Sequence, residues 1–269
     1  MGALCVLSIL WAVGSAGAVS FIQIHPSVVE ISAVPGRTTK GSLVIQNPGA
    51  EDLPVAIEVK DGWAQQIGHP SSVPPAEWLF LKIPKKLVVR PYSSRSIPYK
   101  IKVPPTLSGE VLALVYFSGP SEQGGGQTGV QLRHGIPIYL SAKGTGQVTL
   151  TAADARASIP PKGGLEFSVA LVSDGNIHVR PRGEWVITDF FGGETERIPM
   201  GYGSPVFPGA RNTYYATAKR MDWAPGKYKA ALEVTYGDNF EPVKKINKVY
   251  ALDVSEGKVS LTEEVGDAH

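Results

Sequence analysis

Residues 130–140 read VQLRHGIPIYL, and this stretch shows most clearly which backbone the chain adopts. Its apolar residues recur at every second position, which is the side-chain period of a β-strand with one buried face. They are Val130, Leu132, Ile136, Ile138 and Leu140, with His134 as the interruption. Pro137 lies within the run on the opposite face, and a proline cannot donate to a neighbouring strand. The stretch therefore predicts a strand with at least one side free of pairing.

Similar short runs precede this strand along the chain. They are about five to eight residues long, rich in Val, Ile, Tyr and Phe, and separated by Pro, Gly, Asn and Asp, which is typical of strands joined by turns. Helical periodicity is nearly absent. The runs are residues 42–47, 55–59, 79–83, 97–103 and 110–117. They predict an all-β chain with about seven strands by Leu140, the number found in an immunoglobulin-like sandwich.

The strand pattern starts again after residue 146, which predicts a second domain. Three landmarks of the first half recur at a constant offset, and they are Pro91 with Pro208, Gly109 with Gly226, and Ala113 with Ala230. Such self-similarity indicates two copies of one structural unit. We therefore predict two immunoglobulin-like β-sandwich domains in tandem, at residues 19–145 and 146–256, followed by an acidic tail at residues 257–269.

The first residues resemble a signal peptide rather than part of the fold. Residues 1–18 carry no charged side chain, and an apolar run at 3–13 precedes Ala16 and Ala18, the small-residue pattern that signal peptidase accepts. The run is shorter than the ~20 residues that a spanning helix needs, which argues against an uncleaved anchor. We expect cleavage near Ala18 and a bacterial periplasmic or secreted mature chain without a membrane span.

Cysteine content and charge exclude several classes of protein. Cys5 is the only cysteine and leaves with the signal peptide, so the mature domains depend on hydrophobic packing rather than disulfides. The 26 basic and 24 acidic side chains give a net charge of +2, far from the basic footprint of a nucleic-acid-binding protein. We expect no nucleic-acid partner.

No motif indicates a catalytic or cofactor centre. Residues 124–129, GGGQTG, match G-x-G-x-x-G, but a strand follows where a dinucleotide-binding fold needs a helix, so the match is interpreted as an interstrand loop. The histidines lack ligand spacing, and no cysteine can assist them, so we expect neither a metal nor a cofactor. We expect a non-enzymatic protein. A carbohydrate-active enzyme with carboxylates from separate loops remains as an outside alternative.

The aromatic residues favour structural roles. Trp63, Trp78, Trp185 and Trp223 could stack on sugars, but packing between the sheets or at the domain junction is the commoner fate, and we favour it. Tyr228 follows a Pro-Gly turn and is predicted to form a tyrosine corner, in which the hydroxyl bonds the backbone.

The strand at residues 130–140 has two interpretations that its pattern leaves open. An apolar edge strand invites pairing by another chain. The other interpretation is an ordinary final strand, whose side chains fill the core of their own domain and whose proline prevents such pairing.

Four short motifs indicate a family. They are LVIQNP at residues 43–48, FLKIP at 80–84, VVRPY at 88–92 and GIPIYL at 135–140. With them, roughly residues 19–145 resemble the first domain of the periplasmic pilus chaperones of the PapD-like superfamily. The resemblance implies two domains set as a boomerang and a chaperone role in pilus assembly. The last strand of the first domain would lend apolar side chains to an incomplete pilin-like or surface subunit.

The resemblance also implies a set of partner-binding residues and a further partner. The set comprises Val130, Leu132, Arg133, Ile136, Ile138 and Leu140, and the further candidate partner is an outer-membrane usher. The family holds the terminal carboxylate of the subunit with an Arg in the first strand and a Lys in the last. Here residues 21–31 offer only His25, and the last strand offers only Arg133. The alternative function is a structural or adhesive immunoglobulin-like protein with no pilin client.

Overall fold

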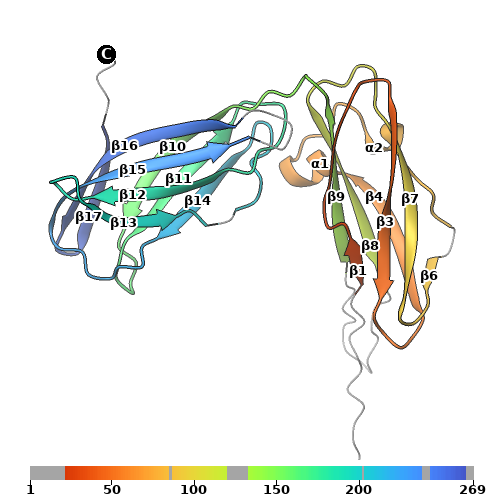
Figure 1. Ribbon diagram of the computed structural model, residues 1–269, viewed down its shortest axis with the longest axis horizontal. Helices are drawn as coiled ribbons and strands as arrows, with labels where there is room; N and C mark the ends of the chain where they lie inside the picture. The colour runs from red at the N-terminus through yellow and green to blue at the C-terminus, as the bar shows by residue number, and fades with distance from the viewer. Residues whose placement is uncertain (1–21, 85–86, 120–132, 202, 238–242, 265–269) are drawn as a thin grey trace, which may run out of the picture.

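The computed structural model describes residues 22–84, 87–119, 133–201, 203–237 and 243–264. It contains two β-sandwiches, and the strands of one run steeply across those of the other (Figure 1). The predicted all-β class with two immunoglobulin-like domains is confirmed. Within the described residues, no helix is long and apolar enough to cross a membrane.

The first domain packs a four-stranded sheet against a five-stranded one. The smaller sheet has the order β1 (Gln23–His25), β3 (Thr38–Asn47), β7 (Ser93–Lys102) and β5 (Leu79–Leu81). The larger sheet has the order β2 (Val29–Ala33), β9 (Arg133–Ala142), β8 (Glu110–Ser118), β4 (Leu53–Asp61) and β6 (Leu87–Val89). Two short helices, α1 (Gly62–Ile67) and α2 (Pro75–Trp78), follow β4.

The first two strands close one side of this sandwich together. Strand β1 pairs with β3 in the smaller sheet, and β2, which begins only a few residues later, pairs with β9 in the larger sheet. The β2–β9 pair is parallel, whereas the pairs of β8 with β9 and with β4 are antiparallel. One segment of chain thus borders both sheets on the side where the final strand of the domain lies.

The second domain repeats this plan. Its smaller sheet has the order β10 (Leu150–Ser158), β11 (Glu166–Ser173) and β14 (Arg211–Thr217). Its larger sheet has the order β13 (Glu194–Pro199), β12 (Arg182–Thr188), β15 (Gly226–Tyr236), β16 (Lys244–Ser255) and β17 (Lys258–Glu263). Each domain places its penultimate immunoglobulin-type strand, β8 or β15, at the centre of the larger sheet. The sequence repeat corresponds to this equivalence, because Gly109 directly precedes β8 and Gly226 opens β15.

The end of the chain differs from the sequence-based expectation. The sequence predicts an acidic tail at residues 257–269, but Lys258–Glu263 form β17, which pairs with β16 from Tyr250 to Ser255. Val259 and Leu261 of this strand pack against the core of the second domain. The acidic composition hid this alternation of apolar and polar residues, which is the signal of a half-buried strand.

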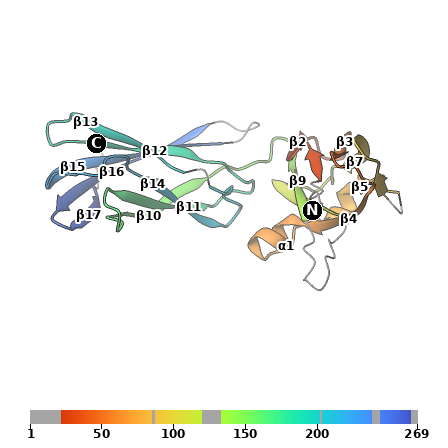
Figure 2. The same cartoon turned by 90° about the horizontal axis from the view of Figure 1, so that it is seen from below.

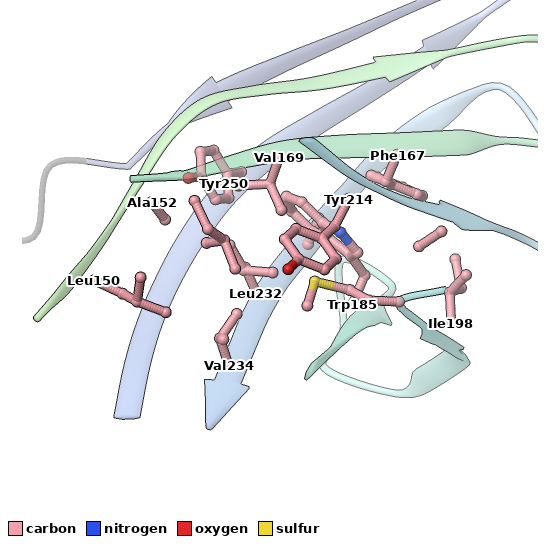
Figure 3. Close-up of a cluster of buried hydrophobic side chains, with 14 of the residues drawn as sticks. Leu150, Ala152, Phe167, Val169, Trp185, Ile198, Tyr214, Leu232, Val234 and Tyr250 are labelled. Atoms are coloured by element: carbon pink, nitrogen blue, oxygen red, sulfur yellow. The ribbon is translucent and has the colours of Figure 1, made fainter. Parts of the chain in front are cut away.

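Each domain encloses its own hydrophobic core. Figure 3 shows part of the core of the second domain, where Trp185 is fully buried and stacks on Phe167 with ring centroids 5.0 Å apart. Trp78 is equally buried in the first domain. The predicted structural role of these tryptophans is confirmed. The tyrosine corner is also confirmed, because the Tyr228 hydroxyl donates to the carbonyl of Ala224 at 2.9 Å.

Removing the central ring of one core should destabilise that domain. We expect Trp185→Ala to lower the free energy of unfolding of the second domain by about 3–5 kcal/mol, because the vacated volume cannot collapse fully. Hydrogen exchange read by mass spectrometry reports each domain separately. Trp223→Ala, at a half-buried ring beside the same core, is the matched control with a smaller expected loss. Equal loss of protection in both domains would contradict two separate cores.

Candidate functional site

Strand β9 is the centre of the predicted partner-binding set. Ile136, Ile138 and Leu140 have no exposed surface and belong to the core of the first domain. This corrects the assignment of these three side chains to a partner, because they already fill the space between their own two sheets. Val130 and Leu132 lie outside the described residues, and their assignment remains a prediction from the sequence.

The backbone N–H and C=O groups of β9 point alternately to its two neighbouring strands. The N–H of Ala142 donates to the carbonyl of Gly109, next to β8, and the N–H of Lys143 donates to the carbonyl of Ala33, next to β2. Even-numbered residues of β9 therefore face β8, and odd-numbered residues face β2, because successive peptide groups of a strand point to opposite sides. The register between β8 and β9 runs without a bulge from Arg133 to Ser141, so the same alternation holds as far as the start of the strand.

This alternation explains why β9 tolerates a proline at position 137. Pro137 is odd-numbered, so its nitrogen points away from β8 and its missing N–H costs no bond in that ladder. Strand β2 covers β9 only from Ile138 to Ala142. No described strand covers the same side from Arg133 to Pro137. The backbone groups of Arg133 and Gly135 therefore face an unpaired stretch, which we call the open edge of β9 (residues 133–137).

The open edge carries a fixed side-chain platform on its outer face. The Arg133 guanidinium lies 3.7 Å from the ring centroid of Tyr116 and pairs with the Glu58 carboxylate. A Cβ on Gly135 would lie 2.9 Å from the Tyr116 ring, so only glycine permits this close approach. Lys60 and then Arg133 hold the pKa of the exposed Glu58 below its usual value. Arg133 is thus held in place beside the open edge.

The opposite end of β9 leads into the domain junction, where α1 supplies an aromatic contact. Asp61 caps α1, because its carboxylate accepts hydrogen bonds from the N–H groups of Trp63 and Ala64. A Cβ on Gly62 would collide with Leu112 at 2.1 Å, so glycine allows α1 to lie directly on β8. The Trp63 ring then meets Phe207 of the second domain edge to face, with centroids 5.3 Å apart.

A buried polar group crosses the junction next to this aromatic contact. Glu110, at the start of β8, is nearly inaccessible, and its two carboxylate oxygens lie 2.8 and 2.9 Å from Nδ1 of His178 in the second domain. The Ser141 hydroxyl donates to the same carboxylate at 3.1 Å. The His178 ring stacks on Tyr139 of β9 with centroids 4.0 Å apart. Two domains therefore satisfy one buried carboxylate.

The other side of His178 faces a second carboxylate and an arginine. Glu30 of β2 lies with Oε1 3.7 Å from Nε2 of His178, and Arg180 pairs with the same Glu30 oxygen. The Arg180 guanidinium also lies 2.5 Å from Nε2 of His178. The neighbouring His178, followed by the charge of Arg180, holds the pKa of Glu30 below its usual value, although its partial burial opposes this. Burial raises the pKa of Tyr139 to about 12.

These groups border a cleft between the domains. The cleft has a volume of about 560 Å³ and is lined by Val28 and Glu30 of the first domain and by residues of the second. The lining residues of the second domain are Arg180, Arg182, Thr235, Tyr236, Gly237 and Val243. The family resemblance predicts basic residues in the first and last strands of the first domain, whereas two arginines reach this cleft from the second domain.

Sequence reasoning missed this junction group. Glu110 opens an otherwise apolar run, EVLALVYF, and His178 lies between Ile177 and Val179, which are both buried. A charged residue at the end of a buried strand is a signal that a partner lies elsewhere in the chain. The sequence does not show which partner, because residues 110 and 178 belong to different domains. Among the described residues, no group of His, Cys, Asp and Glu has the geometry of a metal site.

Comparison with known proteins gives similarities in structure. The class 5 fimbriae chaperone CfaA is 13% identical, with a TM-score of 0.47, over 85% of this chain and 98% of its own. The SafB chaperone, solved with the Salmonella enterica SafA pilin, is 13% identical, with a TM-score of 0.47, over 86% and 97%. The YadV chaperone is 12% identical, with a TM-score of 0.46, over 85% and 98%.

Comparison by sequence gives no further relative. No protein-family model matches the chain, and no curated protein matches it either.

Charging the inner face of β9 should unfold the first domain. We expect Ile136→Asp combined with Ile138→Asp to abolish the melting transition of this domain, because each buried carboxylate without a partner costs several kcal/mol. His134→Asp is the matched control, since alternation places His134 on the same face of β9 but its side chain is exposed. A stable double variant, measured by circular dichroism during heating, would mean that these side chains are not core.

Proposed function

We propose that this chain is a non-enzymatic chaperone-like protein that binds a pilin-like or surface subunit by adding a strand of that subunit to the open edge of β9. The observation that carries the proposal is the open edge itself. The peptide groups of Arg133 and Gly135 point to a side that no described strand covers. A row of backbone donors and acceptors of this kind is what an extended segment of another chain needs in order to pair.

The rest of β9 supports the same function by holding this edge in place. Ile136, Ile138 and Leu140 anchor the strand in the core, while β8 pairs with its full length. An anchored template costs little entropy on binding, because the strand that the partner must match is already ordered. The structure thus divides β9 into an anchored half and an accessible half.

The side chains near the open edge suit a polar border of such an interface. Arg133 is exposed and held by Tyr116 and Glu58, and His134 is exposed on the inner face beyond the end of the core. We propose that Arg133 lies at the contact with the subunit. The involvement of Val130 and Leu132, which precede the open edge, is part of the proposal on the basis of their alternation in the sequence.

The proposal includes export to the periplasm, with an outer-membrane usher as a second partner. It is supported by the signal-peptide pattern of residues 1–18 and by the family motifs of the first domain. The chain lacks the Arg of the first strand and the Lys of the last strand that hold the subunit's carboxylate in the family. We propose that Arg180 and Arg182, which line the junction cleft, take that role.

Removing one outward N–H should weaken client binding without affecting the fold. Pull-down from a periplasmic extract, followed by mass spectrometry, identifies the client, whose affinity is then measured with purified proteins. We expect Arg133→Pro to bind about 2- to 10-fold more weakly than Arg133→Ala, because one intermolecular hydrogen bond contributes about 0.5–1.5 kcal/mol.

Arg133→Ala is the matched control, since both variants lose the guanidinium and only the proline removes the N–H. Melting curves show whether both variants remain folded. Equal affinities of two folded variants would contradict pairing at the open edge.

A further inference from the structure

The protonation state of His178 follows from what surrounds its two ring nitrogens. Nδ1 faces both oxygens of the Glu110 carboxylate, which can only accept, so Nδ1 carries a proton. Nε2 lies 2.5 Å from the Arg180 guanidinium, which can only donate, so Nε2 accepts in this arrangement. The described geometry is therefore that of a neutral His178, with Arg180 placed between Nε2 and the Glu30 carboxylate.

A second proton on His178 is incompatible with this arrangement. Nε2 would become a donor and could no longer accept from Arg180. An alternative acceptor is already at hand, because Oε1 of Glu30 lies 3.7 Å from Nε2. Arg180 forms an ion pair with that oxygen when His178 is neutral. His178 and Arg180 therefore compete for one carboxylate.

We propose that the junction contains a pH-dependent switch made of Glu110, His178, Glu30 and Arg180. In this exchange, the partner of the Glu30 carboxylate changes between Arg180 and His178. When His178 is neutral, Arg180 pairs with Glu30 and donates to Nε2. When His178 gains a proton, its Nε2–H takes over Glu30, and the Arg180 guanidinium turns into the cleft that Arg182 also lines. The protonated ring then bridges Glu30 of β2 and Glu110 of β8, so it ties the second domain to two strands of the first.

The charged and titratable groups around His178 support this exchange. They are Glu110 on β8, Glu30 on β2, Tyr139 on β9 and Arg180 on the same segment as His178. Burial lowers the pKa of His178, but the hydrogen bond to Glu110 and the proton acceptor that Glu30 offers to the charged ring outweigh burial and hold it above its ordinary value of 6.5. Tyr139 stays neutral over this range, because its pKa is raised to about 12.

The direction of the pH effect follows from this raised pKa. A histidine whose pKa is higher in the folded than in the unfolded state contributes stability that is fully present below 6.5 and is lost as the pH rises through the folded value. Glu30 sets the lower limit of the pH range in which this contact stabilises the fold. Because its pKa is lowered in the folded state, its contribution to stability is lost only as the pH falls below the ordinary value of 4.5.

The test follows both partners of the exchange by NMR on the full chain. We expect the His178 ring signals to titrate with a midpoint above 6.5 and the Arg180 guanidinium signal to shift with the same midpoint. The Arg182 guanidinium, which lines the same cleft, is the internal control and should not follow that midpoint. An Arg180 signal that is constant through the His178 titration would overturn the exchange, as would a His178 midpoint at or below 6.5.

Two variants separate the exchange from a purely structural role. Glu30→Gln removes the contested carboxylate, so it should lower the His178 midpoint and abolish the coupled shift of Arg180. Arg180→Gln removes the competitor and should raise the midpoint. An unchanged midpoint in both folded variants would refute the competition.

A melting experiment tests the link between the domains. The melting temperature of His178→Gln should fall further below that of the unmodified chain at pH 5.5 than at pH 8.5, while the exposed His69→Gln shows no such difference. A constant difference across this range would contradict the proposal. None of these readouts needs a client, so the outcome is independent of strand addition at β9.

Discussion

The junction of this protein depends on one buried carboxylate. Glu110 lies at the end of a core strand, where an ionised group costs several kcal/mol unless hydrogen bonds compensate for its lost water. Its compensation comes from Ser141 in its own domain and from His178 in the other. The first domain therefore satisfies its central strand fully only when the second domain is in place. The aromatic contact between Trp63 and Phe207 adds apolar burial beside this polar contact.

This dependence explains why a short linker can hold the two sandwiches in one arrangement. Asn176 accepts from the N–H of Gln147 and donates to the carbonyl of Thr145, while Thr145 accepts from the N–H of Gly109. Gly109 has a φ of +74°, and a Cβ there would lie 2.6 Å from the Asn176 carbonyl oxygen. The glycine is thus needed both for its conformation and for the close approach of the domains. Figure 2 shows the two domains side by side, with these contacts at the junction between them.

Much of the fold could be predicted because period-two alternation is a local property. Strands are indicated by the alternating runs around Leu43 and Leu140. The number of domains is indicated by the repeat of Gly109 with Gly226, and neither signal needs long-range information. Alternation does not distinguish a side chain that fills its own core from one lent to a partner, so the predicted partner contacts of Ile136 and Ile138 are wrong. The contact of Glu110 with His178 could not be found at all, because pairing across domains leaves no spacing in the sequence.

Strands β2 and β17 each pair with one side of a neighbouring strand in the larger sheet of their own domain, β2 with β9 and β17 with β16. Strand β2 is made before β9 and lies parallel to it, whereas β17 is made after β16 and lies antiparallel to it. The order of synthesis therefore affects the domains differently. The first domain has all its strands once Ala142 has emerged and can complete its larger sheet while the rest of the chain is still being made. In the second domain, β16 stays uncovered on this side until Glu263 has been made, so the larger sheet of that domain is completed only after β16 itself has emerged.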